Sequence, residues 1–424
     1  MSFNEAVQYI YSLTNLEVSR DKRIPESGVD NVKKALGYLL VDFASVPTFH
    51  IAGTKGKGTV STIVAYLISK KSREVGLFTS PHFLSITERI SIFRNGEVFY
   101  ITQEEFENIY LKVRRAKEEL RVDLTTFDFL TVMAMVYFVS KKVDYVVLEV
   151  GLGGRLDSTN FCVPKVCGIT LIDYDHTKVL GDTLEEIAYE KCGIIKSSVP
   201  VVSMYQKGSV REVISSVAME KGSKLIFIDD VYKLKEVNVS RKGTFAKVEN
   251  LVDGVIFDVS TNLVGEYFVW NILMAFEMIK EVIPIEYSFL VNVDLPIRGR
   301  FEVIKREPFV VFDVAHTPLS IEKSILTFIG LASTPRVLAI SLLKDKEIDK
   351  ISRVLFSFEK EFKEIYILKI DDPNDGSEVL KEKLSLLGIK TLVIDSVGQV
   401  PEVNTLFIGS FRSYGLVRGG LASL

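Results

Sequence analysis

The chain of 424 residues has little of what builds disulfide-linked or zinc-binding domains. It contains only three cysteines, Cys162, Cys167 and Cys192, and their number and spacing match no disulfide or zinc framework. A His-Glu-x-x-His helix, the other common zinc signature, does not occur. This cysteine usage predicts free thiols in a reducing compartment, and we therefore expect a cytoplasmic protein.

An excess of charge and long apolar runs are also lacking. The formal net charge is −3 at pH 7, so nothing indicates nucleic acid or a membrane as the main partner. The longest apolar run, residues 129–140, is too short to cross a bilayer and predicts a buried helix. The first residues, MSFNEAVQYIYSL, predict a mildly acidic helix rather than a signal peptide. With 47% hydrophobic residues, the length predicts a soluble protein of two or three domains.

Glycine, in contrast, is concentrated in a stretch around which the chain is organised. An apolar strand at 48–52 leads into Gly-Thr-Lys-Gly-Lys-Gly-Thr at 53–59, and an amphipathic helix follows. Glycines at 53, 56 and 58 let the backbone turn sharply and point successive N–H groups at an anion. The helix adds the positive end of its dipole. The pattern predicts a phosphate-binding loop for a nucleoside triphosphate.

The side chains of this loop fit the same function. Lys57 supplies a mobile cation for the terminal phosphates, and Thr59 supplies a hydroxyl near a metal ion. Gly58 separates the two, which departs from the common G-x-x-x-x-G-K-[ST] spacing. The alternative is a glycine-rich turn that exposes Lys55 and Lys57 without binding anything. The order of strand, glycines, cation, hydroxyl and helix favours the nucleotide site.

The remaining pattern predicts an α/β fold. Continuous apolar runs at 144–150 and 166–172 are typical of central parallel strands, and they alternate with helical segments. We expect a large, doubly wound, mostly parallel sheet of P-loop type in a domain spanning 1–295. After a linker at 292–296, a second series of strands and helices predicts a smaller α/β domain at 296–424. The main predicted helices span 3–13, 29–43, 103–120, 126–140, 184–192, 209–221 and 266–282, with a β meander at 231–260.

Polar side chains follow several predicted strands at the edge where such sheets bind ligands. Ser80, Glu149 and His176 combine a hydroxyl, a carboxylate and an imidazole, a donor set suited to Mg²⁺ or Mn²⁺ shared with phosphate oxygens. His82 and His316 also follow strands. For each of these histidines the alternative is a capping or loop residue. His50, inside a strand, is predicted to be a hydrogen-bonded core histidine.

Lys191 lies at the end of a predicted helix. Its position alone predicts a cation that complements the helix dipole.

These residues lie in motifs that carry a family resemblance. The motifs are GTKGKGT, TSPHFLSITERI, TTFDF, LEVGLGGRLDSTN, DYDHTKVLGDT, EKCGIIK, GEYFVWN, GRFE and FDVAHTP. In order and approximate spacing they resemble the folylpolyglutamate synthase/dihydrofolate synthase family, which is similar in turn to the cell-wall Mur ligases. Two departures stand out: Asp128 replaces an acid of glutamate length, and Asp-Val-Ala-His-Thr-Pro replaces the usual D-G-A-H-N-P.

The resemblance implies a role for each matching position. Residues implied to bind ATP are Gly53, Thr54, Lys55, Gly56, Lys57, Gly58, Thr59, Asn271, Arg300 and Asp313, the last two contributed by the smaller domain. Metal ligands implied are Ser80, Glu149, His176 and Lys191, the lysine being carboxylated to a carbamate. Folate or pteroate contacts implied are Pro81, His82, Thr125, Phe127, Asp157 and Ser158. Lys57, Lys191 and His316 are our candidates for catalysis, with His316 as the residue that orients the attack by glutamate.

The function implied is an ATP-dependent amide ligase that adds L-glutamate to folates through an acyl phosphate. ATP is a co-substrate, two Mg²⁺ ions are expected, and we expect a monomer without nucleic-acid or membrane partners. Whether dihydropteroate is also an acceptor remains open at this point. One alternative is a Mur-type amino-acid ligase of cell-wall synthesis, although fewer than sixty residues precede the loop, too few for a separate UDP-binding domain. The other is a P-loop NTPase without ligase chemistry.

Overall fold

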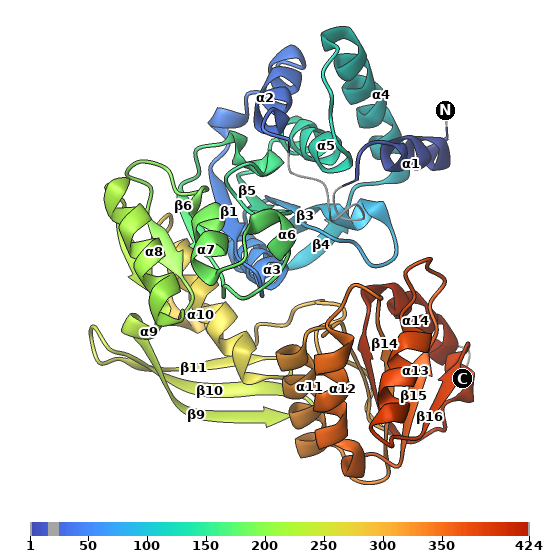
Figure 1. Ribbon diagram of the computed structural model, residues 1–424. Helices are drawn as coiled ribbons and strands as arrows, with labels where there is room; N and C mark the ends of the chain where they lie inside the picture. The colour runs from blue at the N-terminus through green and yellow to red at the C-terminus, as the bar shows by residue number, and fades with distance from the viewer. Residues whose placement is uncertain (1, 16–24, 423–424) are drawn as a thin grey trace. The chain divides into compact units, whose positions relative to one another are not determined.

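The structure is a computed structural model that describes residues 2–15 and 25–422 (Figure 1). Contacts within the chain group these residues into two compact units. The first unit contains residues up to Val237 together with Ala246–Ser260 and Tyr267–Leu295. The second begins at Pro296 and also takes in two short earlier segments, Asn238–Phe245 and Thr261–Glu266.

An eight-stranded sheet forms the centre of the first unit, with strand order β4-β3-β2-β5-β1-β6-β7-β8. The six neighbours β2, β5, β1, β6, β7 and β8 pair in parallel. At one edge, β3 and β4 form an antiparallel hairpin, and β3 also pairs with β2 in antiparallel orientation. This arrangement confirms the predicted mostly parallel, doubly wound sheet. The strands are β1 (Thr48–Ala52), β2 (Val75–Phe78), β3 (Ile90–Arg94), β4 (Glu97–Tyr100), β5 (Tyr145–Glu149), β6 (Val166–Ile169), β7 (Val201–Ser203) and β8 (Leu225–Phe227).

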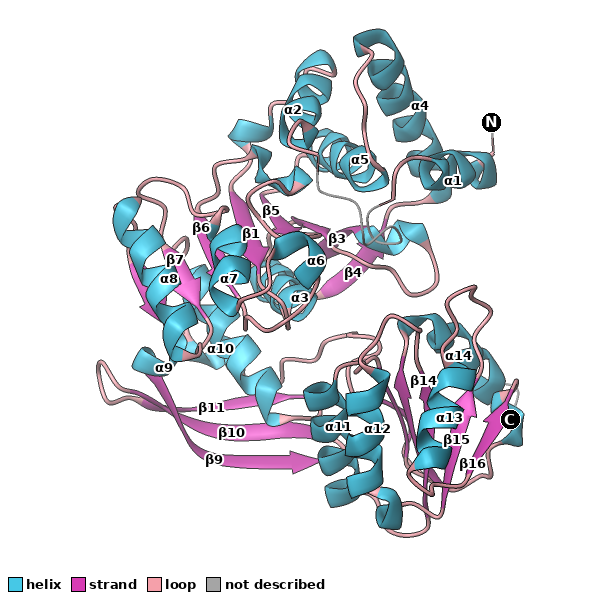
Figure 2. Ribbon diagram, in the orientation of Figure 1, coloured by secondary structure: helices cyan, strands magenta, loops and turns pink. Residues whose placement is uncertain are grey.

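Helices cover both faces of this sheet, so its central strands are buried along nearly their whole length and are mostly apolar. Side chains of alternate residues point to opposite faces, so Val146 and Leu148 of β5 pack with α1, α2, α4 and α5. On the other face, α10 approaches so closely that a Cβ at Gly168 of β6 would lie 2.7 Å from Met278 Sδ. Figure 2 shows α2, α4 and α5 on one side of the sheet and α3 on the other.

The helices of this region agree closely with the sequence pattern. Predicted helices at 103–120 and 184–192 match α4 and α7, whereas the predicted helix at 29–43 ends earlier, at Tyr38. The helices are α1 (Phe3–Ser12), α2 (Gly28–Tyr38), α3 (Lys57–Ser69), α4 (Gln103–Leu120), α5 (Thr126–Lys141), α6 (Thr177–Leu180), α7 (Leu184–Cys192), α8 (Gly208–Glu220), α9 (Ile228–Val231) and α10 (Glu266–Lys280). The short helix α6 was not predicted.

A three-stranded sheet with order β11-β10-β9 accounts for the predicted meander. Its strands are β9 (Tyr232–Ser240), β10 (Gly243–Asn250) and β11 (Ile256–Thr261). Alternate residues of β10 and β11, including Ala246, Val248 and Val259, are buried.

A six-stranded sheet with order β12-β13-β17-β14-β15-β16 forms the centre of the second unit. All neighbouring pairs are parallel except β12 and β13. One face of the sheet packs against α11, α12 and α13 through residues such as Leu338 and Leu406. The elements are β12 (Glu302–Lys305), β13 (Val310–Asp313), α11 (Pro318–Leu331), β14 (Arg336–Ser341), α12 (Ile348–Ser357), β15 (Glu364–Leu368), α13 (Ser377–Leu386), β16 (Thr391–Ile394), β17 (Asn404–Gly409) and α14 (Tyr414–Ala422).

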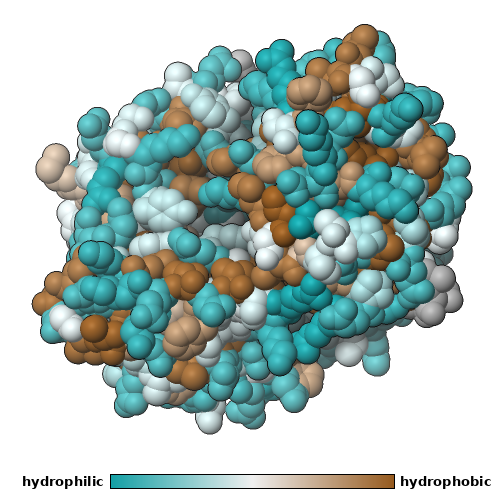
Figure 3. All heavy atoms as spheres, turned by 90° about the horizontal axis from the view of Figure 1, so that it is seen from below, coloured by the Kyte–Doolittle hydropathy of each residue, from teal (hydrophilic) through white to brown (hydrophobic). Residues whose placement is uncertain are grey.

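The outer surface mixes polar and apolar side chains. On the face shown in Figure 3, hydrophilic residues predominate and apolar ones gather in several interspersed groups. Among the described helices, we find none with the length and apolar character needed to span a membrane.

Candidate active site

The glycine-rich loop joins β1 to α3, as predicted. Gly53 and Gly56 have φ values of 139° and 95°, which L side chains rarely adopt, and a Cβ at Gly53 would overlap Thr170. The amide groups of Thr54 and Lys55 both donate to the carbonyl of Leu171 at 3.0 Å. The first bond inside α3 runs from the Val60 amide to the Gly56 carbonyl. The amides of residues 57–59 therefore lie at the helix start, where N–H groups are available to an anion.

Two lysine side chains converge on one carbonyl oxygen of this loop. Lys57 Nζ donates to Gly53 O at 3.2 Å, and Lys191 Nζ donates to the same oxygen at 2.8 Å. Lys191 belongs to the last turn of α7, and only 4% of it is exposed. Lys191 therefore does more than complement the dipole of its own helix, the alternative that its position alone predicted.

Burial also changes the protonation of Lys191. Desolvation, together with the positive charge of Lys57, lowers the pKa of Lys191 to about 7, although Asp175 and Asp157 act in the opposite direction. A substantial fraction of Lys191 is therefore neutral amine near pH 7. The neutral amine is the form that reacts with carbon dioxide to give a carbamate.

Glu149 places a carboxylate at the same edge of the sheet. It ends β5, next to β1, and its Oε2 accepts a hydrogen bond from the Ser80 amide at 3.0 Å. Only 4% of Glu149 is exposed. A Cβ at Gly58 would lie 3.2 Å from Glu149 Oε2, so the glycine leaves room for the carboxylate beside the start of α3. Two of the predicted metal ligands, Ser80 and Glu149, are thus brought together with the phosphate-binding loop.

His176 lies in the segment between β6 and α7, where it immediately precedes the short helix α6. Its φ of 50° is left-handed, and its Nε2 lies 3.7 Å from Asp175 Oδ1. The Asp175 carboxylate also accepts the His176 amide at 3.1 Å. Over residues 2–15 and 25–422, no three His, Cys, Asp or Glu side chains are grouped as a metal site would require. The predicted ligand set contains only two residues of these types, Glu149 and His176.

Asn271 of α10 reaches the nucleotide loop, as its predicted role requires. A Cβ at Gly56 would lie 3.1 Å from Asn271 Oδ1, and the asparagine is 6% exposed. A side chain at residue 56 would be strained by the positive φ and would also crowd Asn271. Thr59, two residues into α3, is also buried at 6% exposure.

Four of the residues predicted to contact folate lie around the start of α5. Thr125 caps this helix, and its amide donates to Asp128 Oδ2 at 2.8 Å. Ser158 Oγ donates to the other oxygen of Asp128. Phe127 packs against Phe78 with ring centroids 5.4 Å apart, and a Cβ at Gly151 would overlap its ring. Asp128, noted in the sequence only as a departure, links Thr125 to Ser158.

Asp157, the fourth, uses both carboxylate oxygens within its own loop. Oδ2 accepts the Leu152 amide at 2.9 Å, and Oδ1 accepts the Thr159 amide at 3.0 Å. Burial raises the pKa of Asp157 to about 6, although these hydrogen bonds favour the charged form.

Pro81 and His82 follow Ser80 in the loop after β2. His82 Nδ1 accepts a hydrogen bond from Arg89 Nε at 2.9 Å, and its Nε2 lies 3.0 Å from the Tyr11 hydroxyl. The Tyr11 contact ties the loop to α1.

Asp313, His316 and Arg300 lie in the second unit. Asp313 ends β13, where it accepts the Ala315 amide at 3.1 Å and the Ser324 hydroxyl. Burial raises the pKa of this carboxyl, whereas the Ser324 hydrogen bond and the Arg300 charge lower it. His316 Nδ1 donates to the Val314 carbonyl at 2.8 Å, which leaves Nε2 as the acceptor of the neutral ring.

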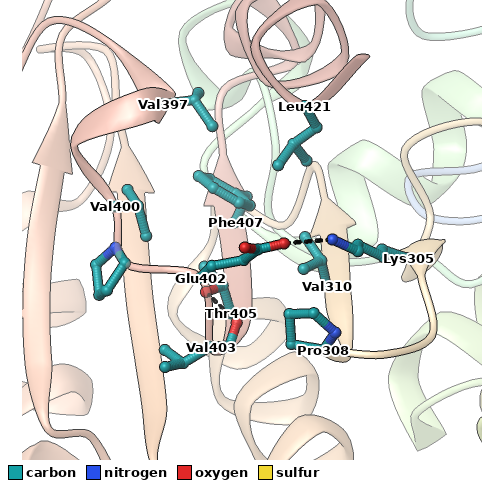
Figure 4. A pocket seen from close by; sticks show the side chains of 11 residues that line it. Lys305, Pro308, Val310, Val397, Val400, Glu402, Val403, Thr405, Phe407 and Leu421 are labelled. Carbon is teal, nitrogen blue, oxygen red and sulfur yellow. Dashed lines mark hydrogen bonds and ion pairs between the residues drawn. The ribbon is translucent and has the colours of Figure 1, made fainter. Parts of the chain in front are cut away.

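A cavity of about 40 Å³ lies elsewhere in the second unit (Figure 4). Val310 and Thr405 in its wall stand near the amino ends of β13 and β17, and Lys305 and Glu402 form an ion pair beside it. Ligands of parallel α/β sheets bind at the opposite, carboxyl edge. This cavity therefore does not contribute to the predicted site.

The histidine and cysteines predicted to be structural are buried. His50 is fully buried, and its Nε2 lies 2.8 Å from Thr159 Oγ1, so the predicted core histidine is confirmed. Cys162, Cys167 and Cys192 are free and buried, as the prediction of free thiols requires. Burial raises the pKa of Cys162 to about 12, so this thiol is not a nucleophile near neutral pH.

Comparison with known proteins defines the class of this site. Residues 51–279 match the family model of the Mur ligase middle domain. This match covers more than half of the chain and includes the glycine-rich loop, Glu149, His176, Lys191 and Asn271. A P-loop ligase of the Mur type is therefore the class to which the fold and the site belong.

Individual relatives narrow the class. The chain is 28% identical to folylpolyglutamate synthase of Lacticaseibacillus casei, over 99% of this chain and 98% of the relative. It is 32% identical to dihydrofolate synthase/folylpolyglutamate synthase of Bacillus subtilis strain 168, over 75% of this chain and 76% of the relative. A solved structure described as an FPGS–AMPPCP–folate complex superposes with a TM-score of 0.81 at 27% identity and covers 99% of both chains.

The chain belongs to the folylpolyglutamate synthase/dihydrofolate synthase family. The predicted family, fold class and enzyme class, an ATP-dependent ligase joining L-glutamate to folates, are thereby confirmed. Membership disfavours both alternatives, the cell-wall ligase and the P-loop protein without ligase chemistry.

Proposed function

We propose that this chain binds ATP at the glycine-rich loop and folate beside the start of α5. Phosphoryl transfer and amide formation would both take place at the carboxyl edge of the large sheet, between these two sites. The observation that carries the proposal is the convergence at one sheet edge. Lys57, Lys191 and Glu149 contact the loop or its helix within hydrogen-bond or van der Waals distance. Folate is assigned to the neighbouring group formed by Thr125, Phe127 and Ser158.

In the first step, the γ-phosphate of ATP passes to a folate carboxylate and gives an acyl phosphate and ADP. The amino nitrogen of L-glutamate then attacks the acyl carbon, and inorganic phosphate leaves. Transfer of a phosphoryl group depends on position and on neutralisation of charge more than on covalent help from the protein. Lys57 and the amides of residues 57–59 supply these in the first unit, and we assign Arg300 and Asp313 to the nucleotide as well. His316, with Nε2 as an acceptor, is assigned to orient the amine.

Magnesium fits the donor set at this edge. Ser80 offers a hydroxyl, Glu149 a buried carboxylate and His176 an imidazole, and phosphate oxygens complete such a site. The carboxylate already lies against the start of α3, where the phosphates are placed. Bound Mg²⁺ would neutralise phosphate charge during transfer. Ser80, Glu149 and His176 would hold Mg²⁺, and the carbamate of Lys191 would contribute a further oxygen.

The charges around Lys191, as well as its position, support the proposed carbamate. Two ammonium groups that share one buried carbonyl repel each other, so neutralisation or carboxylation of Lys191 relieves the repulsion. Carboxylation replaces a cation by an anion beside Lys57 and beside the proposed metal.

We also propose a monomeric, cytoplasmic enzyme. The free cysteines support a reducing, cytoplasmic compartment, and the small net charge supports the absence of nucleic-acid or membrane partners.

The test of the proposed sites is binding of ATP and folate measured separately on purified protein. Phe127→Ala should weaken folate binding and leave ATP binding unchanged, whereas Asn271→Ala should do the reverse. Equal effects of both variants on both ligands would contradict the two-site assignment.

A further inference from the structure

A chain of buried hydrogen bonds connects β1, the strand that leads into the nucleotide loop, to the loop that carries Ser158. His50 Nε2 lies 2.8 Å from Thr159 Oγ1, and Thr159 Oγ1 in turn donates to Asp157 Oδ1. His50 and Thr159 are 0% exposed and Asp157 is 3% exposed. Sequence reasoning assigned His50 to the core and did not single out Thr159.

The chemistry of the three groups determines which atom donates the proton in each of these hydrogen bonds. An ionised carboxylate only accepts hydrogen bonds, so the Thr159 hydroxyl must donate its proton to Asp157. The same oxygen is then free to accept from His50, which places the imidazole proton on Nε2. Within the described part of the chain, His50 Nδ1 has no hydrogen-bond partner, so Nε2 makes the histidine's one polar contact.

Asp157 in turn holds the loop at 151–160 in place. Its second oxygen accepts the Leu152 amide at 2.9 Å, so the carboxylate spans the loop from one side to the other. Ser158, next to Asp157, reaches the Asp128 carboxylate at the start of α5. The loop also lies against the end of α7, where the Arg155 amide donates to the Glu190 carbonyl at 2.8 Å and a Cβ at Gly154 would lie 2.7 Å from the Lys191 carbonyl.

We propose that His50 and Thr159 are positioning residues of the ligase: they fix the Asp157 loop, and with it Ser158, relative to the strand that carries the nucleotide loop. Neither residue contacts substrate. Each acts through Asp157 on the geometry of the folate site, so their loss should weaken folate use more than ATP use. This inference rests on the folate site proposed above.

Matched substitutions separate this role from packing. Thr159→Val keeps the shape and removes the hydroxyl, whereas Thr159→Ser keeps the hydroxyl. His50→Leu removes the donor, whereas His50→Gln places an N–H group near the position of Nε2. A hydrogen bond to a charged group contributes enough that its loss should raise the KM for folate by about tenfold or more.

The experiment measures KM for folate and for ATP, and the thermal midpoint, for the parent and these four variants. We expect Thr159→Val, which loses the bond to the Asp157 carboxylate, to raise the KM for folate about tenfold. His50→Leu loses a bond between neutral groups and should raise it about fivefold, while the KM for ATP changes less than about twofold in both variants. Thr159→Ser and His50→Gln should stay close to the parent. The double variant of His50→Leu and Thr159→Val should cost little more than either single one, because both interrupt one chain.

Two results would overturn the proposal. One is an unchanged KM for folate in Thr159→Val, and the other is an equal rise in both KM values with a fall in the thermal midpoint. If Thr159→Val does not fold, His50→Leu compared with His50→Gln decides the same question. A parent enzyme that releases ADP without folate and glutamate would instead contradict the proposed function and leave the two failures distinguishable.

Discussion

At the scale of single residues, the structure changes the role expected for Lys191 from its place at a helix end. Its position in the sequence alone predicted a cation that complements the helix dipole, and the family resemblance implied a carbamate. In the structure its ammonium group is buried against Gly53 O, beside Lys57. A fixed second positive charge at that point would oppose the proposed metal. The chemistry of Lys191 is therefore the residue-level feature most open to a direct test.

We predict that Lys191→Arg loses nearly all activity, and because the side chain is buried beside Lys57, the larger guanidinium should also lower the thermal midpoint. Arginine complements a helix dipole as well as lysine does, but it cannot form a carbamate. Its fixed charge would stand where the carbamate is proposed. Turnover and the thermal midpoint of the variant, together with the intact mass of the native protein, provide the measurement.

Lys191→Ala serves as the control, since acetate in the vacated space should restore part of its activity but none in Lys191→Arg. Full activity of Lys191→Arg, with no added mass on the native lysine, would refute the carbamate.

Glu149→Gln tests the proposed metal ligand. The change keeps the side-chain shape and the hydrogen bond to the Ser80 amide but removes the negative charge. We expect kcat to fall by about 10²-fold or more, as for loss of a major electrostatic group. Steady-state turnover at several Mg²⁺ concentrations measures the effect, and parent-like turnover at saturating Mg²⁺ would remove Glu149 from the site.

His50 gives a prediction for acid stability. Burial, together with the charge of Lys196, lowers the pKa of His50 to about 3, whereas its unfolded value is about 6.5. As pH falls from 6.5 towards 3, the unfolded chain therefore takes up a proton that the folded chain does not, and stability is lost. Between pH 7 and pH 5 the parent should lose about 2 kcal/mol more than His50→Gln.

Urea unfolding of both proteins at the two pH values measures this difference. Parallel losses in the parent and His50→Gln would contradict the lowered pKa, because they would show that His50 takes up its proton over the same pH range in the folded and the unfolded state.

At the scale of secondary-structure elements, local chemistry explains which boundaries the sequence predicted. Helices α4 and α7 begin after Thr102 and Thr183, and each threonine forms a capping box with a glutamate three residues later. Their predicted limits agree with the structure. Helix α2 ends at Tyr38, and Leu40 just after it has a left-handed φ of 54° with no glycine to indicate the end, so the predicted end extended five residues too far.

The sequence predicted those parts of the site that lie where a strand runs into a loop or helix and that have a recognisable motif in a short stretch of sequence. The glycine-rich loop and the Glu149 strand end are of this kind. The contacts between His50 and Thr159, and between Asp128 and Ser158, join residues 109 and 30 positions apart. Such pairs depend on strand order, which periodicity along one segment does not give. The short helix α6 was missed for a related reason, since a single turn has no period to detect.

Lys57→Ala tests the loop as an element. Lys57 is the first residue of α3 and is only partly buried, so its loss should change the free energy of unfolding by less than about 1 kcal/mol. ADP release should fall by at least about 10²-fold because the cation for the terminal phosphates is gone. The matched control is Lys165→Ala. Lys165 is an exposed lysine at the amino end of β6, opposite the end that carries the nucleotide loop, and this variant should behave as the parent. Parent-like ADP release by Lys57→Ala would contradict the nucleotide site.

At the scale of the whole molecule, the alternation of strands and helices was enough to predict two α/β sheets. The order of strands within each was not predictable, because β17 inserts between β13 and β14 and β5 inserts between β2 and β1. The insertion of β5 brings Glu149 beside the nucleotide loop, because β5 pairs with β1. The fold class and the family therefore followed from the sequence, whereas the hydrogen-bonded neighbours of each site residue required the structure.

The central claim is that ATP cleavage by this chain is coupled to formation of an amide between a folate and glutamate. The most direct measurement is ADP release with dihydropteroate or tetrahydrofolate as acceptor, each with and without L-glutamate. We expect rapid ADP release only when an acceptor and glutamate are both present, with phosphate and glutamate incorporation in equal amounts. The acceptor that supports release distinguishes dihydrofolate synthesis from polyglutamylation. ADP release at the same rate without acceptor or glutamate would contradict the ligase function.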